Sequence, residues 1–228
     1  MLCGIGIVFH SRLLYAAIVQ GGGLSLATAI SLIGLQLSVI GLLGAINENL
    51  RGMSAGLLML AALTLLANID AGTGTISELS WQLRAHVLAS MFAYGLLTAG
   101  AIVAFYALVQ DRRLRSAQLS AVNYLFAPLE TTERMLFAVS ASGFTVLALS
   151  VVSGFAFVDN LFAQHLVHKT ALSMLALLLF GILLLGRQLA GWRGKRAVYL
   201  YLASFAVLSL GYFGSRFVLE EVLGRSWG

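Results

Sequence analysis

Two histidines stand at the start of long apolar segments, and imidazole is a side chain that binds metal ions and haem iron near neutral pH. His86 follows a polar stretch and precedes one apolar run, and His168 opens the next run but one. Two neutral imidazoles from different helices can occupy both axial positions of a haem iron, so the pair is a candidate haem site. The alternative is that each ring lies in the polar headgroup zone as an ordinary amphipathic side chain.

Two further histidines and two cations are weaker candidates. His10 lies deep in the first apolar run, where an ionisable residue is a functional candidate by default and a structural polar cluster is the alternative. His165 would share a helical face with His168, but we expect it in the preceding loop. Arg84 and Lys169 stand beside the two candidate ligands. They could pair with haem propionates, or simply extend to the membrane interface.

Hydroxyl side chains follow His86 along the same apolar run. Ser90, Tyr94 and Thr98 recur every four residues, so they form a row that drifts slowly around a helix. These groups could contact the edge of a bound haem, or they could donate hydrogen bonds to carbonyls of their own helix. The sequence leaves both readings open.

The composition indicates a membrane protein. Of the 228 residues, 60% are hydrophobic and only 10% are charged, which is far from the average soluble domain. Lipid offers the backbone no hydrogen-bond partners, and the apolar runs lack the alternation of a barrel, so each run must form a helix. We expect an all-α fold, a single polytopic transmembrane helix bundle over residues 1–228. The seven or so expected spans are 2–19, 24–47, 52–69, 84–110, 134–157, 168–188 and 197–219.

The basic residues predict how the bundle is oriented. Nine of the fourteen Lys and Arg residues lie in or beside the connections 48–52, 111–134 and 189–196. By the positive-inside rule these connections are cytoplasmic, which places the N-terminus in the cytoplasm and the C-terminus in the periplasm. The histidine-bearing segment before 168 then faces outward. The net charge of +5 is thus explained by membrane orientation, and we expect no nucleic-acid partner.

Small residues repeat at heptad-like spacing in two of the expected spans. Such stripes allow helices to approach closely in lipid, or could form a groove for a flat ligand. In the span 24–47 they are Ser31, Gly34, Ser38, Gly41 and Ala45, and in the span 134–157 they are Ser140, Gly143, Ser150 and Gly154.

The cysteine count limits the chemistry. Cys3 is the only cysteine, so the chain contains no intramolecular disulfide, no CxxC redox pair and no CxxCH haem-attachment motif. Any haem would therefore be held non-covalently, as b-type haem. The sequence offers no nucleophile, phosphate loop or acid–base pair to assign as an active site, and we expect that the protein is not an enzyme.

Three stretches carry a resemblance to known proteins: RAHVLASMFAY from residue 84, PLETTERMLF from residue 128 and HKTALSMLALLL from residue 168. With the runs that follow them, they resemble the cytochrome c assembly protein family, of the CcsA, CcmC and HemX types. The chain is most similar to the short YpjD-like inner-membrane branch that lacks the tryptophan-rich motif. The resemblance implies a haem-handling bundle in the bacterial inner membrane, with His86, His168 and the upstream His10 as its histidines.

A tryptophan-rich outer loop is absent from the sequence, because Trp81, Trp192 and Trp227 stand alone. We therefore expect a haem-binding protein that assists cytochrome c assembly or haem handling at the outer face of the inner membrane. Its partners would be the lipid bilayer, haem and other cytochrome assembly or membrane proteins.

Two other functions fit the same residues. The first is an accessory or transport protein with an outer divalent-metal site, because imidazole suits Zn, Ni and Cu. The second is a structural partner without any cofactor, held by its small-residue faces. The ligands of such a metal site would be His86, Asp159, His165 and His168.

Overall fold

A computed structural model describes residues 2–16, 26–66, 80–116, 128–157 and 167–214, and the regular secondary structure in these ranges is all helical. The helices are α1 (Leu2–Tyr15), α2 (Leu26–Gly44), α3 (Arg51–Leu66), α4 (Trp81–Arg115), α5 (Leu129–Phe157), α6 (Val167–Ala190) and α7 (Gly194–Ser209). A 3₁₀ turn, η2 (Glu48–Leu50), precedes α3, and a π-helical turn, η5 (Leu210–Gly214), follows α7.

Each of the seven predicted spans overlaps one of these helices, but several boundaries differ. α4 runs over 81–115 where 84–110 was expected, and α5 begins at residue 129 where 134 was expected. The Ser80 hydroxyl accepts a hydrogen bond from the Leu83 N–H at the start of α4, at 3.4 Å. A charged turn outside the lipid can remain helical because water and ion pairs satisfy its polar groups. Hydropathy alone therefore predicts helices that are too short.

The helices differ in whether they can cross a bilayer alone. Among the described residues, α4, α5 and α6 are long and apolar enough to do so, and the segments 28–44 and 51–65 are shorter apolar helices. α1 and α7 have 14 and 16 residues, fewer than the roughly 20 needed for a hydrocarbon core of about 30 Å. The structure thus shows a membrane helix bundle, while seven full spans remain a prediction.

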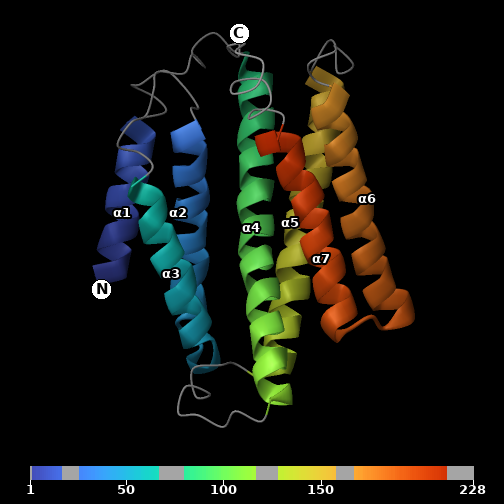
Figure 1. The fold of residues 1–228 in the computed structure, drawn as a ribbon. Helices are drawn as coiled ribbons and strands as arrows, with labels where there is room; N and C mark the ends of the chain where they lie inside the picture. The colour runs from blue at the N-terminus through green and yellow to red at the C-terminus, as the bar shows by residue number, and fades with distance from the viewer. Residues whose placement is uncertain (1, 17–25, 67–79, 117–127, 158–166, 215–228) are drawn as a thin grey trace.

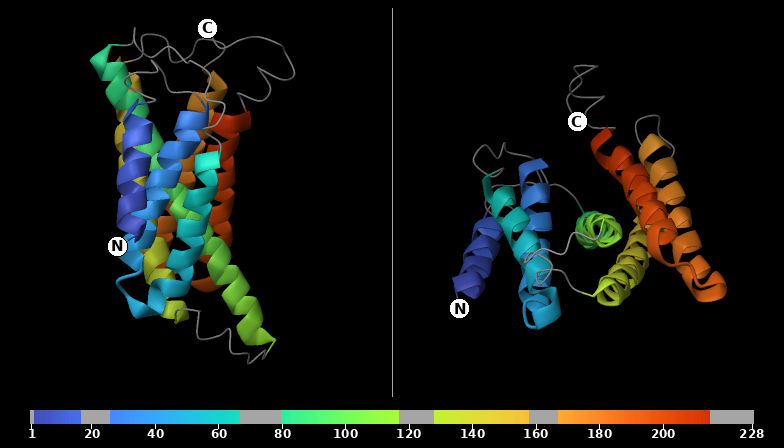
Figure 2. Two further views of the ribbon diagram at one scale, coloured as in Figure 1. Left: turned by 90° about the vertical axis from the view of Figure 1, so that its left-hand side faces the viewer. Right: turned by 60° about the horizontal axis from the view of Figure 1, so that its bottom comes forward.

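α4 lies at the centre of the bundle (Figures 1 and 2). It packs against α2 on one side and against α5 and α7 on the other. α6 packs against the same two helices, α5 and α7, so α4 and α6 occupy opposite corners of a four-helix arrangement. α1 and α3 both pack on α2, on the side of α4 opposite α5 and α7.

The two stripes of small residues face neighbouring helices. A Cβ added at Gly143 would lie 2.6 Å from Leu97 Cδ2 on α4. On α2, a Cβ at Gly34 would collide with Thr64 of α3. These glycines therefore allow α5 to approach α4 and α2 to approach α3, which is the packing role expected of small stripes in lipid.

Ion pairs join three helices at the end of the bundle where α4 stops and α5 starts, which we name the charged end (Figure 1). Lys195 Nζ of α7 lies 3.1 Å from Asp111 Oδ2 of α4. The Gly194 N–H donates a 2.7 Å hydrogen bond to Glu133 Oε1 of α5, and Arg193 Nε lies 3.8 Å from Glu133 Oε2. Gly194 has a φ of +60°, which favours glycine at this turn between α6 and α7.

Candidate functional site

His86 and His168 lie at the end of the bundle opposite the charged end, which we name the histidine end. His86 is in the second turn of α4, and His168 is in the first turn of α6. Both helices begin at this end (Figure 1), as the sequence predicts for the fourth and sixth spans. α4 and α6 each pack against α5 and α7. The two imidazoles therefore come from helices at opposite corners of the four-helix arrangement.

The His86 side chain is partly buried against α5. Its Nδ1 lies 2.9 Å from the Ser153 hydroxyl oxygen. A Cβ added at the next residue, Gly154, would lie only 3.0 Å from His86 Cε1. The ring therefore rests on the α5 backbone at a position where any larger residue would displace it.

Two more serines complete a connected group around His86. The Ser90 hydroxyl donates to the His86 carbonyl at 2.8 Å and lies 2.6 Å from the Ser150 hydroxyl oxygen. The Ser153 hydroxyl donates to the Ser150 carbonyl at 2.8 Å. We call Ser90, Ser150 and Ser153 the serine cluster, and it joins α4 to α5 next to the candidate ligand.

Ser153 was not among the residues predicted from the sequence. Ser150 and Gly154 belong to the small-residue stripe, but Ser153 lies one position before Gly154 and breaks its spacing. The signal that could have found it is its i, i+3 relation to Ser150, since residues three apart share a helix face.

The hydroxyls that follow His86 on α4 form hydrogen bonds within the helix bundle. The Thr98 hydroxyl donates to the Tyr94 carbonyl at 2.8 Å, and the Tyr94 hydroxyl lies 2.8 Å from that of Ser209 on α7. The Tyr94 ring also packs against the rings of Phe205 and Tyr212, with centroids 5.7 and 5.9 Å away. Of the two readings left open by the sequence, the structure therefore supports bonding to the helices.

The remaining candidates at the histidine end differ in exposure. His168 and Arg84 are exposed, whereas Lys169 is half-buried. η5 packs against this part of α6, because a Cβ added at Gly211 would lie 3.1 Å from Leu172 Cβ. His165 lies outside the described residues.

His10 lies in a different part of the molecule. Only 4% of it is exposed, and its Nε2 lies 2.8 Å from the Ser31 hydroxyl oxygen in the contact between α1 and α2. α1 packs against α2, and α2 in turn packs against α4. This arrangement favours the polar-cluster reading of His10 over a shared site with His86.

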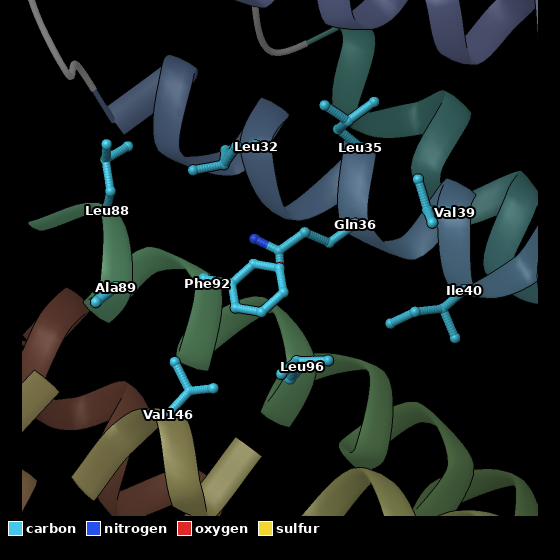
Figure 3. Close-up of a pocket in the computed structure, with 10 residues that line it drawn as sticks. All are labelled: Leu32, Leu35, Gln36, Val39, Ile40, Leu88, Ala89, Phe92, Leu96 and Val146. Carbon is cyan, nitrogen blue, oxygen red and sulfur yellow. The ribbon is translucent and has the colours of Figure 1, made fainter. Parts of the chain in front are cut away.

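A cavity of about 650 Å³ lies between α2 and α4 (Figure 3). Its lining is aliphatic and aromatic apart from Gln36, whose Nε2 donates to the Met91 carbonyl at 3.4 Å. The lining residues do not include His86. The lining of the cavity suits apolar chains.

Clusters of three or more His, Cys, Asp or Glu side chains that could hold a metal ion do not occur among the described residues. Two members of the alternative divalent-metal site, Asp159 and His165, lie outside them. The metal-site reading therefore stays untested.

The residues at the histidine end fit an imidazole-ligated haem in their donor chemistry. A metal-binding histidine usually has its second nitrogen held by a hydrogen-bond partner, which orients the ring. His86 has such a partner in Ser153, and His168 presents an exposed imidazole at the same end.

Fold and site together define a class, an all-α membrane protein with histidines at one end of a helix bundle. Residues 6–223 match the model of the family described as cytochrome C assembly protein, and the chain belongs to this family. This confirms the resemblance carried by the three sequence stretches.

Two relatives show how far the similarity extends. Inner membrane protein YpjD of Escherichia coli K12 is 30% identical over 228 residues, which cover 96% of this chain and 85% of that protein. An uncharacterized 28.8 kDa protein of Azospirillum brasilense is 30% identical over 141 residues, which cover 61% of this chain and 52% of that protein. No solved structure matches the chain significantly.

Proposed function

We propose that this protein binds b-type haem non-covalently through His86 and His168, and that it assists cytochrome c assembly or haem handling at the outer face of the bacterial inner membrane. The observation that carries the proposal is the position of His86. Its ring is partly buried at the histidine end, with Nδ1 2.9 Å from Ser153 Oγ. Membership of the cytochrome c assembly family supports the role, and the name of the E. coli relative supports the membrane.

Each residue at the histidine end has a distinct part in this proposal. His86 and His168 would hold the iron through their imidazoles, and Arg84 and Lys169 would pair with the propionates through charge-assisted hydrogen bonds. Haem between two neutral imidazoles has a reduction potential set by its axial ligands and by the hydrogen bonds they make. The protein acts by holding haem and is not an enzyme.

The proposed orientation places the histidine end in the periplasm. The Lys and Arg residues of the charged end are the ones that the positive-inside rule assigns to the cytoplasm. The N-terminus is then cytoplasmic and the C-terminus periplasmic, in a multi-pass protein. Haem is therefore held on the side of the membrane where the C-terminus lies.

The test is an absorption spectrum of the purified protein, with metal analysis of the same sample. We expect haem in the wild type and shifted Soret and α bands after His86→Ala or His168→Ala, because each variant removes one axial ligand. His165→Ala is the matched histidine control and should leave the spectrum unchanged. His10→Ala should lower the folded yield without moving the bands, because the ring packs against Ser31.

Three results would contradict this assignment. They are a wild type that takes up no haem, a double His86→Ala, His168→Ala variant with full occupancy and an unaltered spectrum, and a divalent metal bound in place of iron. The last would establish the metal-site reading. A protein with neither haem nor metal would establish the structural-partner reading.

A further inference from the structure

The contact between His86 and Ser153 is made by tertiary packing, because the two residues are 67 positions apart. α4 and α5 are close enough here for the imidazole and the hydroxyl to meet at 2.9 Å. The question that the contact raises is which of the two groups supplies the proton.

Counting protons in the serine cluster answers it. A serine hydroxyl has one proton to donate, and Ser153 donates it to the Ser150 carbonyl at 2.8 Å. Turning that proton toward His86 would leave two oxygen atoms, Ser153 Oγ and the Ser150 carbonyl, facing each other at 2.8 Å with no proton between them. This arrangement favours Ser153 Oγ as the acceptor and Nδ1–H as the donor in the contact with His86.

The rest of the cluster is consistent with this count. Ser90 donates its proton to the His86 carbonyl, so the 2.6 Å contact with Ser150 uses the Ser150 proton. Each of the three hydroxyls then donates one hydrogen bond. Ser90 accepts one from Ser150, and Ser153 accepts one from His86.

Gly154 leaves room for the His86 ring beside the α5 backbone. A Cβ at residue 154 would lie 3.0 Å from Cε1, 3.6 Å from Nδ1 and 3.7 Å from Nε2 of His86. The edge of the ring that carries both nitrogens therefore lies close to the α5 backbone.

We infer that Ser153 is a positioning residue that fixes the proton of neutral His86 on Nδ1 and thereby leaves the lone pair of Nε2 as the metal-binding atom. In a neutral imidazole one nitrogen carries the proton and the other is the acceptor or ligand. The assignment of Nε2 as an iron ligand rests on the proposed haem site, whereas the position of the proton does not.

The position of the proton can be measured in haem-free protein labelled with ¹⁵N-histidine at a pH where the ring is neutral. His86→Ala identifies the signals of His86. We expect a proton on Nδ1 and none on Nε2 in the wild type. Ser153→Ala should shift the proton toward Nε2, and Ser153→Thr, which keeps the hydroxyl, should restore the wild-type pattern.

The same variants loaded with haem give a second readout. Removing a hydrogen-bond partner of a metal-binding histidine lowers metal affinity about 10- to 100-fold, so Ser153→Ala should lose haem faster by that order. Its midpoint potential should rise, because an imidazole that no longer donates from Nδ1 stabilises ferric iron less. Ser142→Ala on the same helix is the control, because this exposed hydroxyl bonds only to the Ala138 carbonyl.

The two ideas fail in different ways. A proton on Nε2 in the wild type, or wild-type spectra and affinity in a folded Ser153→Ala variant, would overturn the role of Ser153. A wild type with its proton on Nδ1 that takes up no haem would overturn the proposed function and support the proton assignment. Thermal unfolding of each variant shows whether a change reflects loss of folding instead.

Discussion

The Glu133 carboxylate connects α5 to the turn between α6 and α7. One oxygen accepts a 2.7 Å hydrogen bond from the Gly194 N–H, and the other faces Arg193. The side chain is only 12% exposed, so water cannot fully replace these partners. Hydrogen bonds to charged groups at such positions contribute more than exposed ion pairs do.

We expect Glu133→Ala to lower the stability of the folded protein by about 2 kcal/mol, the usual size for a hydrogen bond to a charged group. Thermal unfolding in detergent measures the change. Glu130→Ala is the control, because Glu130 pairs with Arg134 on an exposed face, with both side chains more than 60% exposed, and such a pair contributes about 0.5 kcal/mol or less. Equal losses in the two variants would contradict the role given to Glu133.

Asp111 provides a pH-dependent contact at the same end. α4 has 35 residues, or about 52 Å at 1.5 Å per residue, so its charged last turn extends beyond a hydrocarbon core of about 30 Å. Hydrogen bonds from Arg115, and then from Lys195, lower the pKa of the Asp111 carboxyl below its usual value. The contact therefore stabilises the fold above the ordinary carboxyl pKa, and this is lost as the pH falls through the lowered pKa.

The prediction for Asp111 concerns the pH dependence of unfolding. Between neutral pH and about pH 3, Asp111→Asn should show a smaller drop in melting temperature than the wild type, because the variant no longer has this carboxylate to protonate. Parallel curves for the two proteins would show that Asp111 makes no such contribution.

At the scale of helices, the close approach of α4 and α5 determines the candidate site. Gly143 allows Leu97 to pack against α5, and about three turns further along α5 the same interface brings Ser153 to His86. A change that separates the two helices at Gly143 should therefore also disturb the imidazole.

We expect Gly143→Leu to reduce the folded yield and the melting temperature, because its Cβ alone would lie 2.6 Å from Leu97 Cδ2 and overpacking costs about 1–3 kcal/mol. Size-exclusion profiles and thermal unfolding in detergent measure both. The neighbouring Ser142 is exposed, so Ser142→Leu is a control with the same side chain on the same turn. An unchanged yield and melting temperature for Gly143→Leu would count against tight packing here.

At the scale of the whole molecule, the ion pairs that join α4, α5 and α7 lie at the end of the bundle opposite His86 and His168. The charged end holds Asp111, Glu133, Arg193 and Lys195, whereas α4 and α6 begin at the histidine end. The basic residues Arg193 and Lys195 are among those from which the positive-inside rule predicts a cytoplasmic charged end.

Labelling with an impermeant thiol reagent tests this orientation. In a Cys3→Ser background, a cysteine replacing Lys195 should react only after the cells are opened, because the positive-inside rule predicts a cytoplasmic charged end. A cysteine replacing Asp159, in the connection between α5 and α6, should react in intact cells. Labelling of both from outside would rule out the proposed topology.

The sequence by itself determined that the chain forms apolar helices, because backbone groups in lipid must be bonded within each segment. It also predicted that His86 and His168 lie at one end, since alternate spans enter the membrane from the same side. The small stripes were a further prediction, and Gly34 and Gly143 confirm it through the side chains they accommodate.

Only the tertiary structure decided which side chains meet. Periodicity gives the face on which a residue lies, but not the rotation and crossing of two packed helices, and these determine distances between side chains. That is why Ser153 was missed, why His10 was left open until Ser31 was found beside it, and why the proton of His86 could not be assigned. A hydrogen bond between residues 67 positions apart depends on shifts of about 1 Å between helices, because such bonds weaken beyond about 3.2 Å.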